Sequence, residues 1–224
     1  MASYLVYDAI TEDDTPPMQA PRPKTVLESN VERLRRELAR TAGRRVAILG
    51  QPDAGKSSLL SKLSRNEVEP PPLVGTHTDA TNWAADPEAS LLCRWQDFVF
   101  ADVPGYDTVN HPTQVMLDTF PFGSFDAFAL VVRGKVRQAD QQLHARLQRQ
   151  SRPVVVVRTF SESLECPERA AVRKDLLQQL GSGSPGDVVF ASNRTGEGMQ
   201  EVLRRISASA GRLDAAMGQR ETTP

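Results

Sequence analysis

The sequence is poor in cysteine and has almost no net charge. Only two cysteines, Cys93 and Cys166, occur among 224 residues, and they lack the spacing of metal ligands. Sparse thiols of this kind indicate a reducing compartment rather than a disulfide-stapled secreted domain. The formal net charge is −1, without the basic excess that is typical of nucleic-acid-binding proteins, so we expect no nucleic-acid partner.

Long apolar runs are also missing. No run approaches the roughly 20 residues that span a bilayer, and the first residues lack the basic start of a signal peptide. We therefore expect a cytoplasmic protein without an integral membrane segment.

Four segments can be distinguished along the chain. Residues 1–24 are polar and end in a proline-rich stretch, which predicts a flexible leader. Residues 25–43 are expected to form an N-terminal helix, and residues 44–210 the main domain. Residues 211–224 are polar, which predicts a flexible C-terminal tail.

The N-terminal helix is predicted from its apolar residues, which recur at helical spacing: Val26, Leu27, Val31, Leu34 and Leu38. Such a stripe fits two uses. The helix could pack on the main domain or form a cap with a solvated face, or it could mediate self-association or bind a partner.

Apolar segments alternate with helical ones throughout the main domain. The segments expected to be strands are residues 45–50, 97–105, 125–134, 152–160 and 186–192. The segments expected to be helices are residues 55–66, 138–150, 166–180 and 196–210. Continuous apolar runs such as "VVVV" are typical of buried parallel strands. This alternation predicts an α/β fold, with a mostly parallel central sheet and helices on both faces.

The stretch "GQPDAGKSS" has the spacing of a phosphate-binding loop, or P-loop. It follows an expected strand and opens an expected helix, which is the context this loop requires. Glycines allow backbone N–H groups to point at phosphate, and the start of the helix adds the positive end of its dipole. Lys56 would reach the outer phosphates, and the Ser57 hydroxyl would bind Mg²⁺.

A second motif, "DVPG", ends the expected strand at residues 97–105. Asp102 could hold Mg²⁺ through water, and the Gly105 N–H could meet the terminal phosphate of the nucleotide. The same four letters also suit an ordinary strand-to-turn transition, but that alternative loses weight downstream of a P-loop.

With "VVVVRTFSES" and "FASNRTGEG", these motifs resemble the translation-factor-related class of P-loop GTPases. The Era-like and immunity-related branches of that class are the most similar, and the resemblance covers roughly residues 44–210. It implies GTP or GDP with Mg²⁺ as ligands, and a switch loop whose threonine senses the γ-phosphate. "GTHTDAT" favours Thr78 for this role, with Thr81 as the runner-up and Thr76 as a third candidate.

The position after the Asp-x-x-Gly glycine holds Tyr106, where Ras-type enzymes place a water-orienting glutamine. Glutamine-based hydrolysis by that route is therefore absent. The nearby Asp107 and His111 are expected at solvated loop positions rather than next to the attacking water.

The base-reading motif of the family diverges in this chain. Thr159 matches a threonine variant of the motif, Phe160 stands where the family has lysine, and Glu162 replaces aspartate. The resemblance implies that Glu162 would bind the N1 and N2 donors of guanine while Phe160 covers the base. The alternative is that these are loop residues without base contact. Ser192-Asn193-Arg194 resembles the Ser-Ala-Lys loop, whose backbone meets guanine O6.

Three catalytic residues are expected, namely Lys56, Thr78 and Gly105. The expected Mg²⁺ ligands are Ser57, Thr78 and Asp102. The expected nucleotide-binding residues are Gln51, Pro52, Asp53, Ala54, Gly55, Lys56, Ser57, Ser58, Thr159, Phe160, Glu162, Ser192, Asn193 and Arg194.

The resemblance implies a small GTPase that acts as a molecular switch with slow intrinsic turnover. An effector or activating protein would accelerate it, or a homodimer would. A second function class is a nucleotide-binding interaction module that hydrolyses little or no GTP. A third class, an ATP-using kinase or ATPase, would need a lid and an acidic strand motif, and the sequence shows neither.

Asp53 stands where some members of the class carry a cation-binding asparagine, so K⁺ is a further expected ligand. Alternatively, the side chain of Asp53 points outward.

Overall fold

The computed structural model describes residues 22–73, 81–150, 152–181 and 187–207. The predicted C-terminal tail, all of the leader except residues 22–24, and the switch candidates Thr76 and Thr78 lie outside these residues.

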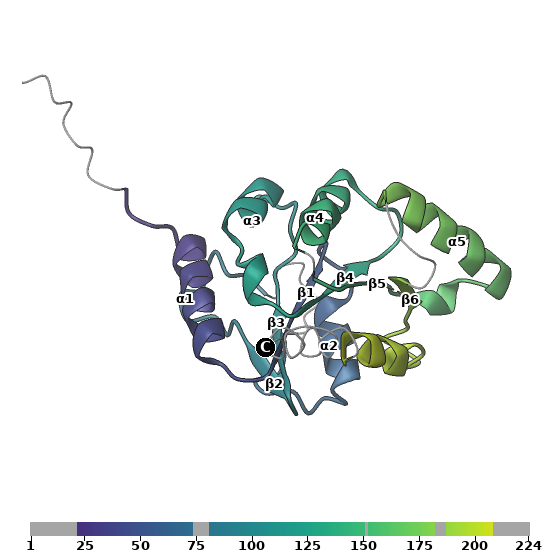
Figure 1. The fold of residues 1–224 in the computed structure, drawn as a ribbon, viewed down its shortest axis with the longest axis horizontal. Helices are drawn as coiled ribbons and strands as arrows, with labels where there is room; N and C mark the ends of the chain where they lie inside the picture. The colour runs from purple at the N-terminus through teal and green to yellow at the C-terminus, as the bar shows by residue number, and fades with distance from the viewer. Residues whose placement is uncertain (1–21, 74–80, 151, 182–186, 208–224) are drawn as a thin grey trace, which may run out of the picture.

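A six-stranded sheet forms the centre of the molecule (Figure 1), with the strands in the order β2-β3-β1-β4-β5-β6. Its strands are β1 (Arg44–Gly50), β2 (Cys93–Trp95), β3 (Phe98–Asp102), β4 (Ala127–Val132), β5 (Val154–Arg158) and β6 (Val188–Phe190). All neighbouring pairs are parallel except β2–β3, which is antiparallel. The expected parallel core is thus confirmed, whereas the edge strand β2 was not predicted.

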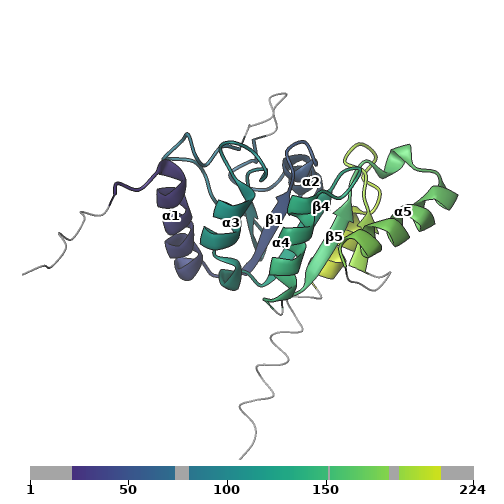
Figure 2. The same cartoon turned by 90° about the horizontal axis from the view of Figure 1, so that it is seen from above.

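Helices cover both faces of this sheet, as expected (Figures 1 and 2). The helices are α1 (Val26–Arg40), α2 (Lys56–Leu63), α3 (Thr113–Thr119), α4 (Gln138–Gln148), α5 (Cys166–Gln179) and a last one at residues 199–207. One hydrophobic cluster joins α1, α4 and α5 to one face, and a second joins α2 and residues 199–207 to the other. Among the described residues, no helix is both long and apolar enough to cross a bilayer.

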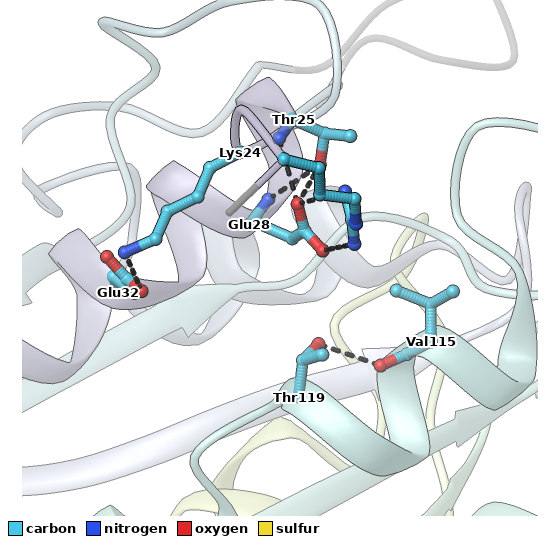
Figure 3. A network of polar contacts seen from close by, with 7 residues as sticks. Lys24, Thr25, Glu28, Glu32, Val115 and Thr119 are labelled. Carbon is cyan, nitrogen blue, oxygen red and sulfur yellow. Dashed lines mark hydrogen bonds and ion pairs between the residues drawn. The ribbon is translucent and has the colours of Figure 1, made fainter. Parts of the chain in front are cut away.

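Helix α1 begins with a reciprocal cap. The Thr25 hydroxyl accepts a hydrogen bond from the backbone N–H of Glu28, and the Glu28 carboxylate accepts one from the backbone N–H of Thr25 (Figure 3). On its inner face, Leu34 and Leu38 are fully or almost fully buried in the core. The apolar face of this helix therefore packs within the chain, which is the first of the two uses considered for it.

Polar contacts also tie α1 to residues 83–86 and to the end of α3. The Asn30 side-chain amide donates to the carbonyls of Trp83 and Asp86, both at 2.8 Å. Arg35 donates to the carbonyl of Thr119, the last residue of α3, at 2.6 Å. The buried carbonyl of Trp83 needs such a donor, so α1 supports the packing of the segment around it.

Candidate functional site

The P-loop connects the carboxyl end of β1 to the start of α2, at the edge of the sheet where parallel α/β folds bind ligands. Gly50 closes β1 so tightly that a Cβ there would lie 2.4 Å from the carbonyl oxygen of Val131 on β4. Gly55 caps α2 in the left-handed region, with φ 86°. Both glycines thus serve the loop geometry that the motif predicts.

Three successive P-loop carbonyls are held from outside the loop by side chains that follow three different strands. Arg133 donates to Asp53 O at 3.4 Å, Thr159 Oγ1 to Ala54 O at 2.7 Å, and Asn193 Nδ2 to Gly55 O at 3.0 Å. In a trans peptide unit the C=O and N–H point in opposite directions. Holding these carbonyls therefore turns the N–H groups of Gly55 and Lys56 to the other side, where a P-loop receives phosphate.

Lys56 is buried beneath this loop, and its ammonium donates to the carbonyl of Gln51 at 3.0 Å. Burial lowers the pKa of Lys56 to about 8, although Asp102 and Asp53 oppose the shift by attraction. Among the described residues, the ammonium donates a hydrogen bond to a neutral carbonyl alone, so an anionic phosphate would be a stronger hydrogen-bond partner for it.

Asp102 ends β3 and is also buried. Neither of its carboxylate oxygens has a hydrogen-bond partner in the described part of the chain. Burial raises the pKa of Asp102, while the Ser57 hydroxyl and Lys56 act in the opposite direction. An orphaned carboxylate beside a hydroxyl fits the oxygen chemistry of Mg²⁺, which one or two carboxylates and the substrate phosphates commonly bind. No group of three His, Cys, Asp or Glu in the described residues could hold a metal alone.

Gly105 brings the "DVPG" loop against the P-loop. A Cβ on Gly105 would lie 2.5 Å from the backbone nitrogen of Pro52 and 2.7 Å from two of its ring carbons. This approach requires glycine, and it places the backbone of the second motif next to the first. The two motifs predicted to share one nucleotide are therefore in contact.

Tyr106 does not face the P-loop. Its ring is fully buried in the core, and its hydroxyl donates to Asp140 Oδ1 on α4 at 2.5 Å. Burial and the neighbouring carboxylate raise the pKa of this phenol well above its ordinary value. The expectation for His111 was wrong, because this residue is buried, with 6% of its surface exposed, and it lines a small cavity together with Trp83 and Phe120. Asp107 is exposed, as expected.

The loops after β5 and β6, which carry the remaining expected nucleotide-binding residues, lie next to the P-loop. Thr159 is fully buried, and its hydroxyl bonds the P-loop carbonyl described above. Ser192 is also fully buried, and its hydroxyl accepts from the backbone N–H of Thr195 at 3.1 Å. Arg194 is largely exposed, and its Nε lies 3.9 Å from the Glu162 carboxylate.

Glu162 and Asn193 each present a spare acceptor in this region. Glu162 Oε2 and Asn193 Oδ1 are buried and have no hydrogen-bond partner among the described residues. A hydrogen bond with the Ser192 hydroxyl is the main cause that lowers the pKa of Glu162, so its ionised form is favoured. Ionised Glu162 can accept hydrogen bonds from a ligand's N–H groups.

The switch candidate Thr81 is partly buried beside a cavity of about 170 Å³ that Asp102 also lines. Trp83, Leu91 and Cys93 belong to the apolar part of its wall. The structure thus brings Thr81 near the expected Mg²⁺ ligand. Thr78 and Thr76 lie outside the described residues, so the choice among the three remains a prediction.

Asp53 occupies the loop with φ 58° and an exposed side chain. The remaining expected P-loop residues lie between β1 and the first turn of α2, as the motif requires: Gln51, Pro52, Ala54 and Ser58. Sequence reasoning missed Arg133, which follows β4 and reaches the same loop. Its position at the carboxyl end of a parallel strand was the available signal.

Comparison with known proteins identifies the family. The model of the 50S ribosome-binding GTPase family matches residues 45–159, just over half of the chain. The chain belongs to this GTPase family. The resemblance to translation-factor-related P-loop GTPases is therefore confirmed.

A relative within the family is the GTPase Der of Sulfurihydrogenibium sp. (strain YO3AOP1), which is 28% identical over 173 residues. The match covers 72% of this chain but only 37% of that relative.

Solved structures share the fold at low sequence identity. A probable GTP-binding protein engB is 14% identical with a TM-score of 0.55, and the match covers 75% of this chain and 99% of that one. A single-residue variant of Aquifex aeolicus Era bound to GDP·AlF₄⁻ is 16% identical with a TM-score of 0.53, and the match covers 75% of this chain and 57% of that one. At such identities these likenesses establish the G-domain fold alone.

Proposed function

We propose that the protein binds GTP with Mg²⁺, hydrolyses it slowly to GDP and acts as a molecular switch. Membership of a GTPase family supplies the nucleotide class. The observation that carries the proposal is that Lys56 and Asp102 are both buried beside the P-loop with little hydrogen bonding: among the described residues, the Lys56 ammonium bonds a neutral carbonyl and neither Asp102 oxygen has a hydrogen-bond partner. A nucleotide with its divalent ion would compensate both groups.

In this proposal, the residues of the chain act mainly by positioning and electrostatics. The N–H groups of the P-loop and the Lys56 ammonium would stabilise charge that develops on the phosphates, and the Gly105 N–H would meet the terminal phosphate. Ser57, Asp102 and one switch threonine would hold Mg²⁺, which neutralises phosphate charge when bound. We retain Thr78 for that role, with Thr81 as the alternative.

Slow turnover is expected because the side chain of the residue after Gly105 does not point toward the phosphates. Tyr106 is committed to the core and to Asp140, so it cannot orient water. An effector or activating protein, or a second copy of the chain, would then supply the missing charge. K⁺ beside Asp53 would be an alternative source of that positive charge. The exposed side chain of Asp53 also suits the alternative, in which it points outward.

Guanine selectivity would come from the loops after β5 and β6. The ionised Glu162 carboxylate would accept the N1 and N2 hydrogens of guanine through its spare oxygen. The backbone of Ser192, Asn193 and Arg194 would meet the O6 acceptor. Thr159 contributes by holding the P-loop rather than by touching the base.

Single-turnover hydrolysis of GTP and ATP, followed in parallel by phosphate release, tests this function. We expect GTP to be hydrolysed and ATP to be left, and Lys56→Ala to abolish the reaction. Lys62→Ala is the matched control, because Lys62 is an exposed lysine on the same helix. A preference for ATP would refute the guanine assignment. Tight GTP binding without phosphate release would show a nucleotide-binding interaction module instead.

The cation and dimer hypotheses need separate measurements. Equal hydrolysis rates in K⁺, Na⁺ and tetramethylammonium would exclude a role for K⁺ beside Asp53. Sedimentation with a non-hydrolysable GTP analogue and with GDP measures association. A dimer found only with the GTP analogue would support self-activation, and a monomer in both states would leave activation to another protein.

A further inference from the structure

We propose that Phe160 and Arg133 form a base shelf, in which the Phe160 ring contacts the nucleotide base and Arg133 is the positioning residue that holds the ring against the P-loop. The inference rests on the proposed nucleotide binding. It assigns the role of the family's absent lysine to two residues from different loops, one of which belongs to no recognised motif.

The backbone of Phe160 is the first observation. This residue has φ 55° and ψ 38°, the left-handed region that large L-residues rarely adopt. Residues held there cluster at ligand sites, where surrounding contacts enforce the conformation. The conformation keeps the ring partly exposed at the carboxyl edge of the sheet instead of in the core. Its edge lies 3.7 Å from the position a Cβ on Gly55 would occupy, so it borders the P-loop.

Arg133 is the second observation. Its guanidinium carbon lies 4.1 Å from the centre of the Phe160 ring, and Nη1 donates to the Asp53 carbonyl at 3.4 Å. Arg133 forms no ion pair with a carboxylate anywhere in the described part of the chain. The guanidinium is therefore used on an aromatic face and a loop carbonyl, which fixes the ring relative to the P-loop.

The charge around the shelf suits a nucleotide. Burial lowers the pKa of the Arg158 guanidinium, and repulsion by Arg133 lowers it further. Two like charges kept close together favour an anionic ligand nearby. The spare acceptors of Glu162 and Asn193 belong to the same group of loops, and they would meet base N–H groups while the Phe160 ring meets the base face.

Equilibrium binding of GDP and of inorganic pyrophosphate, measured by calorimetry, tests the shelf. We expect Phe160→Ala to weaken GDP binding roughly 10- to 100-fold and Arg133→Ala about 3- to 10-fold. Pyrophosphate affinity should change less than about twofold, since pyrophosphate has no base. The double variant should bind GDP as weakly as Phe160→Ala alone, because Arg133 acts through the ring.

Rescue separates positioning from general support of the fold. Replacing the shelf by the family's own residue, with Phe160→Lys in the Arg133→Ala background, should restore most of the GDP affinity. Lys135→Ala is the matched control, since it removes a charge from the same loop and should leave GDP affinity unchanged. Phe160→Leu is the second variant if Phe160→Ala does not fold; it keeps apolar bulk and should lose only the aromatic contribution.

Each remaining outcome has a distinct meaning. Equal GDP affinity in the wild type and in both single variants overturns the shelf and leaves the proposed function intact. Equal losses of GDP and pyrophosphate affinity in Arg133→Ala also overturn it, because Arg133 would then act on the phosphate loop. No wild-type binding of any nucleoside diphosphate overturns both this inference and the proposed function.

Discussion

A methyl group added at Gly105 would press directly on the P-loop. The new Cβ would lie 2.5 Å from the nitrogen of Pro52 and 2.7 Å from two of its ring carbons. Ordinary contact begins at 3.4 Å, so one of the two loops must move by about 0.9 Å. The backbone of Gly105 is not in the left-handed region, and alanine can therefore adopt its conformation. The effect of Gly105→Ala thus comes from this contact alone.

The size of the effect follows from the cost of overpacking, which is about 1 to 3 kcal/mol. The side chain of Pro52 is closed into a ring with its own backbone nitrogen, so it cannot rotate away. If the strain is relieved by separating the two motifs, it weakens the state that binds GTP rather than the whole fold. A cost of about 1 to 3 kcal/mol then corresponds to a loss of roughly 5- to 150-fold in GTP affinity.

Two measurements distinguish a local effect from a global one. Titration with a fluorescent GTP analogue measures nucleotide affinity, and chemical denaturation without nucleotide measures the free energy of unfolding. Gly123→Ala is the matched control, because a Cβ there would meet nothing within 4 Å and the backbone is not left-handed. We expect Gly123→Ala to bind GTP as the wild type does.

The reasoning would be refuted if Gly105→Ala bound GTP with wild-type affinity. Such a result would mean that the two motifs are not held this close in the nucleotide-binding state. An equal loss of affinity in Gly105→Ala and Gly123→Ala would refute it as well, because the close contact exists at only one of these glycines.

Three further predictions concern buried polar groups. Thr159→Val keeps the shape of the side chain but leaves a P-loop carbonyl without its donor, and we expect a loss of about 1 to 3 kcal/mol in chemical denaturation; an unchanged midpoint would contradict it. Asn30→Ala removes the donor of two loop carbonyls, and a loss of about 2 kcal/mol should lower the melting temperature by roughly 4 to 8 °C, whereas the exposed Arg36→Ala on the same helix should not. Burial lowers the pKa of His144, so below its ordinary value near 6.5 the unfolded chain binds more protons than the fold, and the free energy of unfolding should fall as pH drops from 7 to 5. His144→Gln should flatten that fall in denaturation curves at a series of pH values, and an unaltered slope would exclude His144 as its cause.

The parallel sheet and its P-loop could be predicted from the sequence, because buried parallel strands give continuous apolar runs and the P-loop has fixed spacing. The edge strand β2 could not. It has three residues, which are too few to show a periodicity in the sequence. Helix α3 was missed for a similar reason, since none of its seven residues is buried and no apolar stripe marks it.

The contacts that the side chains of the site make with one another could not be predicted from the sequence. Thr159 was expected among the nucleotide-binding residues, but no pattern in the sequence shows that its hydroxyl bonds the carbonyl of Ala54, a residue more than a hundred positions earlier. Arg133 carries no motif, and its role depends on the distance to Phe160 across two loops. Hydroxyl and guanidinium groups bond whichever acceptor the fold brings near, and that is a property of tertiary structure.

The position after Gly105 shows why the proposed hydrolysis needs help from outside the chain. A water-orienting side chain there would have to face the phosphates, but Tyr106 faces α4 and places its hydroxyl on Asp140 inside the core. Restoring glutamine at this position would bury an amide in the space of an aromatic ring and leave Asp140 without that donor. Tyr106, at the position that Ras-type enzymes use for catalysis, instead packs the segment after Gly105 against α4. On the proposed function, we therefore expect acceleration from a group that approaches the phosphates from solvent, such as a cation or a side chain of another protein.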